Sequence, residues 1–166
     1  MKVLFGVTVA ILGAAACGSS DMMNPGDDLP AVARVVPAAE ATGVDPAAPI
    51  VVQFTHAMMA GMEQYVALHV GETPAGPVVD GGWTWSSDRT VLTFVPVVPL
   101  QSSTRYTIHL GGGLRDSLNR EVNHGACAAQ GGRTTTSGMM AGSGMMGGGW
   151  RHSNGTYGML FSFTTA

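Results

Sequence analysis

Apolar and polar residues alternate in short runs along most of the chain, and clusters of turn-forming residues separate these runs. In the run from Ile50 to Phe54, for example, every second side chain is apolar and bulky. Alternation with a period of two is typical of a β-strand that buries one face. The pattern predicts seven strands, at residues 32–37, 50–54, 65–71, 78–85, 90–96, 104–110 and 157–165.

The even spacing of the runs favours an antiparallel β-sandwich over alternating strand and helix units. No segment has convincing helical periodicity, although residues 57–64 are compatible with a single helical turn. Residues 86–89 read Ser-Ser-Asp-Arg and predict a hairpin turn. We therefore expect an all-β domain over residues 32–166, with a long glycine- and methionine-rich insertion, residues 123–156, before the last strand.

The N-terminal segment, residues 1–16, predicts a signal peptide. Lys2 supplies one positive charge, and the apolar run that follows carries none. This run is shorter than the roughly 20 residues that a membrane-spanning helix needs, but it suits the apolar part of a signal peptide. The next segment, residues 17–31, begins with Cys17 and is polar and proline-bearing, so we expect a flexible tether.

Small residues lead into Cys17, in the order Ala14-Ala15-Ala16-Cys17-Gly18. This sequence resembles the lipobox of bacterial lipoproteins, which implies that Cys17 becomes the lipidated first residue. Ala14 departs from the pattern, which usually has leucine there. Ordinary cleavage after Ala16 is the alternative, and it leaves Cys17 as a thiol. If the resemblance holds, Gly18 implies an outer-membrane lipoprotein that faces the periplasm or the cell surface.

Composition excludes some partners and leaves one cysteine unexplained. Without Lys2 the chain has seven arginines against eleven carboxylates, a formal net charge of −4. Such an acidic chain lacks the basic surface that nucleic acid requires, so we expect no nucleic-acid partner. The only two cysteines are Cys17 and Cys127, which do not make a disulfide framework. Cys127 is open to two interpretations, a buried thiol or a metal ligand.

Several short phrases occur in a fixed order along the chain, at residues 35–44, 50–58, 90–108, 113–119 and 161–165. Together they resemble the bacterial immunoglobulin-like domain of the S-layer (SbsA) type. The resemblance implies a seven-stranded antiparallel immunoglobulin-like sandwich. The chain departs from the family at His56-Ala57, where an acidic residue and proline are common, and in the insertion.

The resemblance also implies roles for individual residues. Tyr106 fits the tyrosine corner of sandwich domains, in which the hydroxyl bonds back to the chain just upstream. Asp116 and Asn119 match a turn of the family and are expected to brace it. Trp83 and Trp85 share one face of a strand and are expected to cover the core.

Methionines concentrate in two loops that an immunoglobulin-like sandwich brings together. The loops after the second, fourth and sixth strands share one pole of such a fold. The first and last of these loops hold seven of the ten methionines beyond Met1, namely Met58, Met59, Met62, Met139, Met140, Met145 and Met146. Methionine used as core filler would instead be expected at inward strand positions.

Thioether and imidazole side chains suit soft or borderline ions, and methionine favours monovalent copper. The candidate ligands at this pole are His56, Met59, Met62, Met139, Met140, Met145, Met146 and His152. The small sandwich with methionine-rich loops is similar in architecture and ligand type to copper carriers of the CopC type. No cofactor other than copper(I) is indicated.

Other interpretations of the same residues remain open. Met58 stands where the family usually has methionine, which favours a packing role. The Gly-Met-Met repeats at residues 138–146 also fit a low-complexity expansion without selected chemistry. His69 and His109 lie on outward strand faces, where we expect them to be solvated.

No catalytic motif is present. The chain lacks a GxSxG elbow, a phosphate loop and an HExxH zinc helix, so we do not expect an enzyme. Two hypotheses follow. The first is a lipid-anchored structural or interaction module of the cell envelope, with an envelope protein or a glycan as partner. The second is soft-metal binding, of copper or silver, at the methionine- and histidine-rich pole.

Overall fold

A computed structural model of the chain describes residues 29–134 and 155–166, except for the side chain of Cys127. The strands in this part are β1 (Val32–Val36), β2 (Ile50–Phe54), β3 (Val66–Val70), β4 (Gly81–Trp85), β5 (Val91–Pro96), β6 (Arg105–Leu110), β7 (Arg133–Thr134) and β8 (Met159–Thr164). Two short 3-10 helices accompany them, η1 (Met62–Tyr65) and η2 (His124–Gln130).

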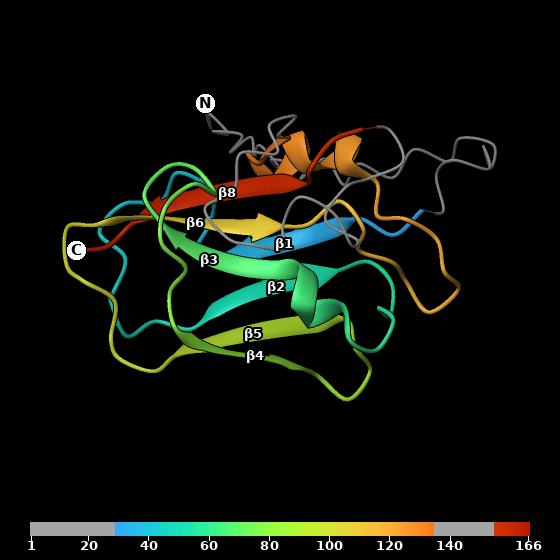
Figure 1. Ribbon diagram of the computed structural model, residues 1–166, viewed down its shortest axis with the longest axis horizontal. Coiled ribbons are helices and arrows are strands. Elements are labelled where there is room, and N and C mark those ends of the chain that lie inside the picture. Colours follow the sequence, from blue (N-terminus) through green and yellow to red (C-terminus); the bar gives the residue numbers. More distant parts are fainter. Residues whose placement is uncertain (1–28, 135–154) are drawn as a thin grey trace, which may run out of the picture.

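The strands form two four-stranded antiparallel sheets that pack face to face (Figure 1). The first sheet has the order β1-β2-β5-β4 and the second the order β3-β6-β8-β7. Without β7, this is the strand arrangement of an immunoglobulin sandwich, in which strands A, B, E and D face strands C, F and G. The structure therefore confirms the prediction of an all-β immunoglobulin-like sandwich.

The predicted strands and the observed strands correspond closely. All seven predicted runs contain a strand, although β4 and β8 each begin a few residues later than expected. The helix η1 lies at the end of the segment for which a single turn was expected. The helix η2 and the strand β7 were not predicted, and both lie in the insertion, where the composition masks any alternation.

Alternating apolar side chains from both sheets form the core. Ile50, Val52 and Phe54 of β2 are at most 2% exposed, as their spacing predicts. Phe161 and Phe163 of β8 face them from the second sheet and are equally buried. Burying a side chain of this size stabilises the fold by about 1.5–3 kcal/mol. The buried core therefore stabilises the sandwich, although the chain carries few charged residues.

The tryptophans and Tyr106 occupy the places that the sequence predicts. Trp83 lies against Phe94 with a ring-centroid distance of 4.8 Å, and Trp85 packs on the core beside it. The hydroxyl of Tyr106 accepts a hydrogen bond from the backbone N–H of Gln101 at 2.8 Å. This is the tyrosine corner, and it fixes the approach to β6.

The outer edge of β8 is covered by two separate parts of the chain. The strand β7 pairs with its first residues, Met159 and Leu160. The segment 40–44 runs along its end, where the N–H of Glu40 donates to the carbonyl of Ser162 at 2.6 Å. Because an open edge strand is a template for unwanted pairing, this double cover protects the sheet.

Candidate functional site

The loops that follow β2, β4 and β6 meet at one pole of the sandwich, as the topology predicts. The N–H of Met58 donates to the carbonyl of Arg89, in the loop after β4, at 2.9 Å. The N–H of Met59 donates to the carbonyl of Arg115, in the loop after β6, at 3.0 Å. Backbone hydrogen bonds therefore join the first loop directly to both of the others.

The predicted ligands that the structure describes differ in their surroundings. His56 is partly exposed, and its Nδ1 lies 2.8 Å from the hydroxyl of Thr55. Met59 is partly exposed and packs against the edge of the core. Met62 is buried, and its sulfur accepts a hydrogen bond from the N–H of Arg115 at 3.3 Å. The thioether of Met62 is thus already used in joining two loops.

The other predicted site residues lie outside the described residues. They are Cys17, Met139, Met140, Met145, Met146 and His152. In the ranges 29–134 and 155–166, no three side chains among histidine, cysteine, aspartate and glutamate are grouped so that they could hold a metal ion. No helix in the same ranges combines the length and the apolar character needed to cross a bilayer.

Besides Met62, two more methionines of this pole belong to the core. Met58 and Met159 are both fully buried and pack within the main apolar cluster. The packing interpretation of Met58 is therefore confirmed. At this pole, buried methionine side chains therefore lie beneath the polar loops.

Asp116 organises the turn that follows β6. Its carboxylate is 1% exposed and accepts hydrogen bonds from the N–H of Leu118 at 3.0 Å and the N–H of Arg120 at 2.8 Å. The side chain of Arg120 donates two more, at 2.7 Å each. Burial alone would raise the pKa of Asp116, but the hydrogen bonds and the charge of Arg120 outweigh it and hold the pKa below its usual value. The predicted bracing role is confirmed.

A second polar region lies on the outer face of the sheet β3-β6-β8, and sequence reasoning missed it. His69 and His109 are 1% and 0% exposed, so the expectation that they are solvated was wrong. The outward side chains of these strands do not face water, because connecting segments fold over them. A signal was present in the sequence, since Ala67 and Leu160 occupy outward positions that a solvated face would give to polar residues.

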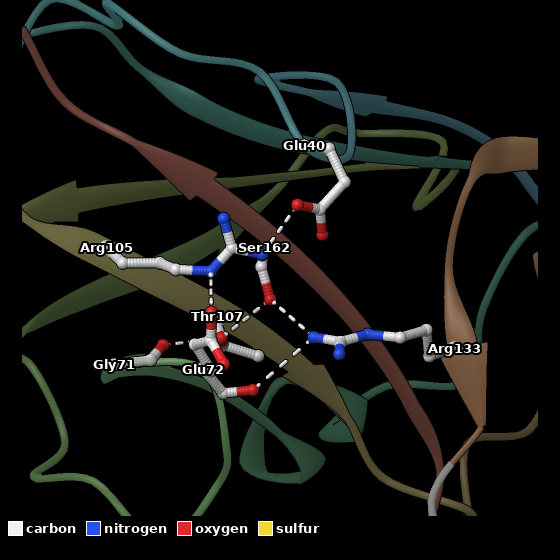
Figure 2. Close-up of polar contacts among 7 residues, drawn as sticks. All are labelled: Glu40, Gly71, Glu72, Arg105, Thr107, Arg133 and Ser162. Carbon is white, nitrogen blue, oxygen red and sulfur yellow. Dashed lines mark hydrogen bonds and ion pairs between the residues drawn. The ribbon is translucent and has the colours of Figure 1, made fainter.

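Hydroxyl groups form the centre of this face (Figure 2). The Oγ1 of Thr107 donates to the carbonyl of Gly71 at 2.7 Å and lies 2.9 Å from the Oγ of Ser162. The Nη2 of Arg133 donates to the same Ser162 oxygen at 3.0 Å. A chain of hydrogen bonds therefore links β6, β8 and the β7 residue Arg133.

Arg105 joins two acidic side chains beside these hydroxyls (Figure 2). Its guanidinium lies 2.6 Å from Glu40 and 3.2 Å from Glu72. The hydrogen bond from Arg105 lowers the pKa of Glu40. Both glutamates are largely exposed, so each pair adds little to stability by itself. Their effect is to hold two connecting segments against the sheet.

The buried histidines lie beside one another on this face. The Nδ1 of His69 lies 3.0 Å from the carbonyl of Gly76, and the Nε2 of His109 lies 2.8 Å from the carbonyl of Tyr157. The two ring centroids are 5.9 Å apart. Burial lowers the pKa of both rings, and that of His109 falls to about 4. Both rings are therefore neutral at pH 7.

A small hollow at the opposite pole offers no comparable chemistry. Its volume is about 170 Å³, and it is lined by Val70, Val79, Val98, Pro99, Leu100, Gln101 and Tyr106. Tyr106 is the titratable residue of this lining, and its hydroxyl is already bound to the backbone of Gln101. The hollow thus presents apolar surface and no reactive group.

The strand order and the tyrosine corner are features of immunoglobulin-like domains, and a family match agrees with them. Residues 27–128, more than half of the chain, match the family described as the bacterial Ig-like domain. The chain belongs to the bacterial Ig-like domain family. No protein with a curated description matches the chain.

This bacterial Ig-like domain is similar to parts of longer proteins of known structure. It matches the S-layer protein rSbsC(31-844) at 17% identity with a TM-score of 0.43, over 60% of this chain and 13% of that one. It matches Mycobacterium tuberculosis L,D-transpeptidase 1 at 23% identity with a TM-score of 0.39, over 57% and 38% of the two chains. A third match is Escherichia coli alpha-2-macroglobulin, at 13% identity with a TM-score of 0.42, over 58% and 6%.

Proposed function

We propose that the protein is a cell-envelope lipoprotein whose Ig-like domain acts as a structural or interaction module without catalytic activity. Membership of the bacterial Ig-like domain family supports the module, and the lipobox-like sequence around Cys17 supports the anchor. The partner is an envelope protein or a glycan, and the membrane is reached through the lipid on Cys17. The net negative charge of the chain argues against nucleic acid as a partner.

The observation that carries this proposal is the use of polar groups within the described residues. Asp116 holds a turn through Arg120, and Arg105 holds two connecting segments through Glu40 and Glu72. Catalytic groups are expected in a cleft, with pKa values matched to proton transfer near pH 7. Here these groups bind to one another and stabilise loops, which is the arrangement expected of a rigid spacer or binding domain.

The anchor is tested by replacing the cysteine. We expect Cys17→Ser to move the protein from the detergent phase to the aqueous phase in a Triton X-114 partition, because the serine cannot form the thioether to the lipid. Mass spectrometry of the purified wild type should show a lipid-modified N-terminal Cys17. The matched control is Ser19→Ala, which leaves the partition unchanged. Wild-type protein that starts at an unmodified Cys17 and remains in the aqueous phase contradicts the anchor.

A second candidate function is soft-metal binding at the pole where the loops after β2, β4 and β6 meet. The convergence of these loops favours it, because His56 and Met59 remain partly exposed there. Thioether and imidazole ligands together suit copper(I). This function is compatible with the module, since a small envelope domain can be both anchored and metal-loaded.

Copper(I) titration under reducing conditions tests this second function. We expect the variant in which Met139, Met140, Met145 and Met146 become leucine to bind copper(I) about tenfold more weakly, a loss of about 1.4 kcal/mol. Leucine keeps the apolar volume of methionine and removes the sulfur, so the change isolates coordination. The control variant is Met58→Leu, whose sulfur lies in the core. Equal affinity of the four-site variant and the wild type would contradict the role of the insertion.

A further inference from the structure

The positions of the ring hydrogens of His69 and His109 follow from their partners. A carbonyl oxygen can only accept a hydrogen bond, so the nitrogen beside it carries the hydrogen. His69 therefore donates through Nδ1 to Gly76, and His109 donates through Nε2 to Tyr157. In each neutral ring the other nitrogen, Nε2 of His69 and Nδ1 of His109, carries the lone pair.

Among the described residues, the lone pair of His69 has no hydrogen-bond donor. Its Nε2 is buried, and no residue in the described part of the chain donates a hydrogen bond to it. A buried acceptor left in this state costs about 1–3 kcal/mol. Such a group in a folded protein calls for a further partner, and a water molecule or an ion can be that partner.

Each of the two rings shares one feature with histidines that bind metal. A metal-ligating histidine usually donates its second ring nitrogen to a carboxylate or a backbone carbonyl, which fixes the tautomer and the ring orientation. Both rings do so here. A metal held linearly between two imidazole nitrogens, at about 2 Å from each, separates the ring centroids by roughly 6 Å. The centroids of His69 and His109 are 5.9 Å apart, so the two rings are close enough for one ion to reach both.

We propose that His69 and His109 form a two-imidazole site for a monovalent soft cation, copper(I) or silver(I), on the outer face of the sheet β3-β6-β8. Copper(I) and silver(I) accept two ligands in a line. Zinc needs four, and no third histidine, cysteine, aspartate or glutamate joins the pair among the described residues. A single positive charge also costs less to bury than a double one.

The charged groups on this face permit a monovalent ion. Arg105 and Arg133 are the nearby cations among the described side chains, and Arg105 is paired with Glu40 and Glu72. Arg133 binds the Ser162 hydroxyl. The site uses none of the ligands expected at the loop pole, so it stands independently of metal binding there.

Imidazole nitrogen NMR tests the site directly. The full chain is used with Cys17→Ser and Cys127→Ser, so that thiols do not take the silver ion, and silver nitrate is added in chloride-free buffer. We expect the Nε2 resonance of His69 and the Nδ1 resonance of His109 to shift together with the first equivalent of silver(I). Resonances of both rings that stay unchanged while those of His56 or the methionine methyl groups shift would overturn the proposal.

Variants separate this site from the loop pole. Against the same double-serine background, His69→Gln should weaken the highest-affinity silver(I) site at least tenfold, whereas His56→Gln and Met59→Leu should not change it. X-ray absorption of the one-equivalent complex should show two nitrogen scatterers and no sulfur. Sulfur scatterers would overturn the proposal and would instead support the methionine pole. The NMR and absorption measurements on unchanged histidines remain decisive even if His69→Gln fails to fold.

Discussion

Acidification from pH 7 to pH 4 is expected to lower the free energy of unfolding by about 3 kcal/mol through His109 alone. The pKa of His109 is about 4 in the folded protein, against an ordinary value of 6.5. Between these two values the unfolded chain binds more protons than the folded one. The stabilisation is therefore complete above pH 6.5 and is lost as the pH falls toward 4.

Urea unfolding of metal-free protein between pH 7 and pH 4 measures this effect, and His109→Gln should flatten the dependence. His69 adds to the loss in the same direction, because burial lowers its pKa as well. The pKa values of Glu40 and Asp116 are lowered, so these carboxylates lose their stabilising effect at lower pH than the histidines do. An unchanged slope in His109→Gln would contradict the neutral buried state of His109.

Replacing Asp116 by alanine is expected to destabilise the domain by about 3 kcal/mol. The carboxylate is buried and accepts hydrogen bonds from two backbone N–H groups and from Arg120. Alanine removes the acceptor of these hydrogen bonds and the negative charge beside the guanidinium of Arg120. The same turn contacts the loop after β2, where Met58 bridges to Asp116, so the whole pole should loosen.

The midpoint of urea unfolding at pH 7 gives the size of this effect. Asp88→Ala is the matched control, because Asp88 also accepts hydrogen bonds from residues two positions away, at Ser86 and Thr90, but is exposed. Asp88→Ala should therefore change the midpoint of urea unfolding only a little. If the two variants unfold at the same denaturant concentration, the buried carboxylate of Asp116 stabilises the domain no more than the exposed carboxylate of Asp88 does.

The strands and the core could be predicted from the sequence because alternation records burial one residue at a time. Ile50, Val52 and Phe54 lie on one face of any strand they form, whatever packs against it. The tyrosine corner at Tyr106 and the turn at Asp116 were equally local, since their partners lie within five residues. The strand β7 was not predicted, because two residues are too few to show a period.

The candidate sites depended on contacts between residues that lie far apart in the sequence. Topology alone placed the loops after β2 and β6 at one pole, and the backbone contact of Met59 with Arg115 agrees. The sequence could not show that Met62 is buried with its sulfur bonded to Arg115, because 53 residues separate the two. The predicted roles of Cys17 and of the Gly-Met-Met segment remain predictions.

By itself, the sequence determined the immunoglobulin-like sandwich, the inward faces of its strands and the loops that share a pole. Only the tertiary structure decided that the outward face of β3, β6 and β8 is covered. Alternation separates one face of a strand from the other, but it does not say whether the second face meets water or another segment of the chain. That difference changes His69 and His109 from solvated side chains into a neutral buried pair.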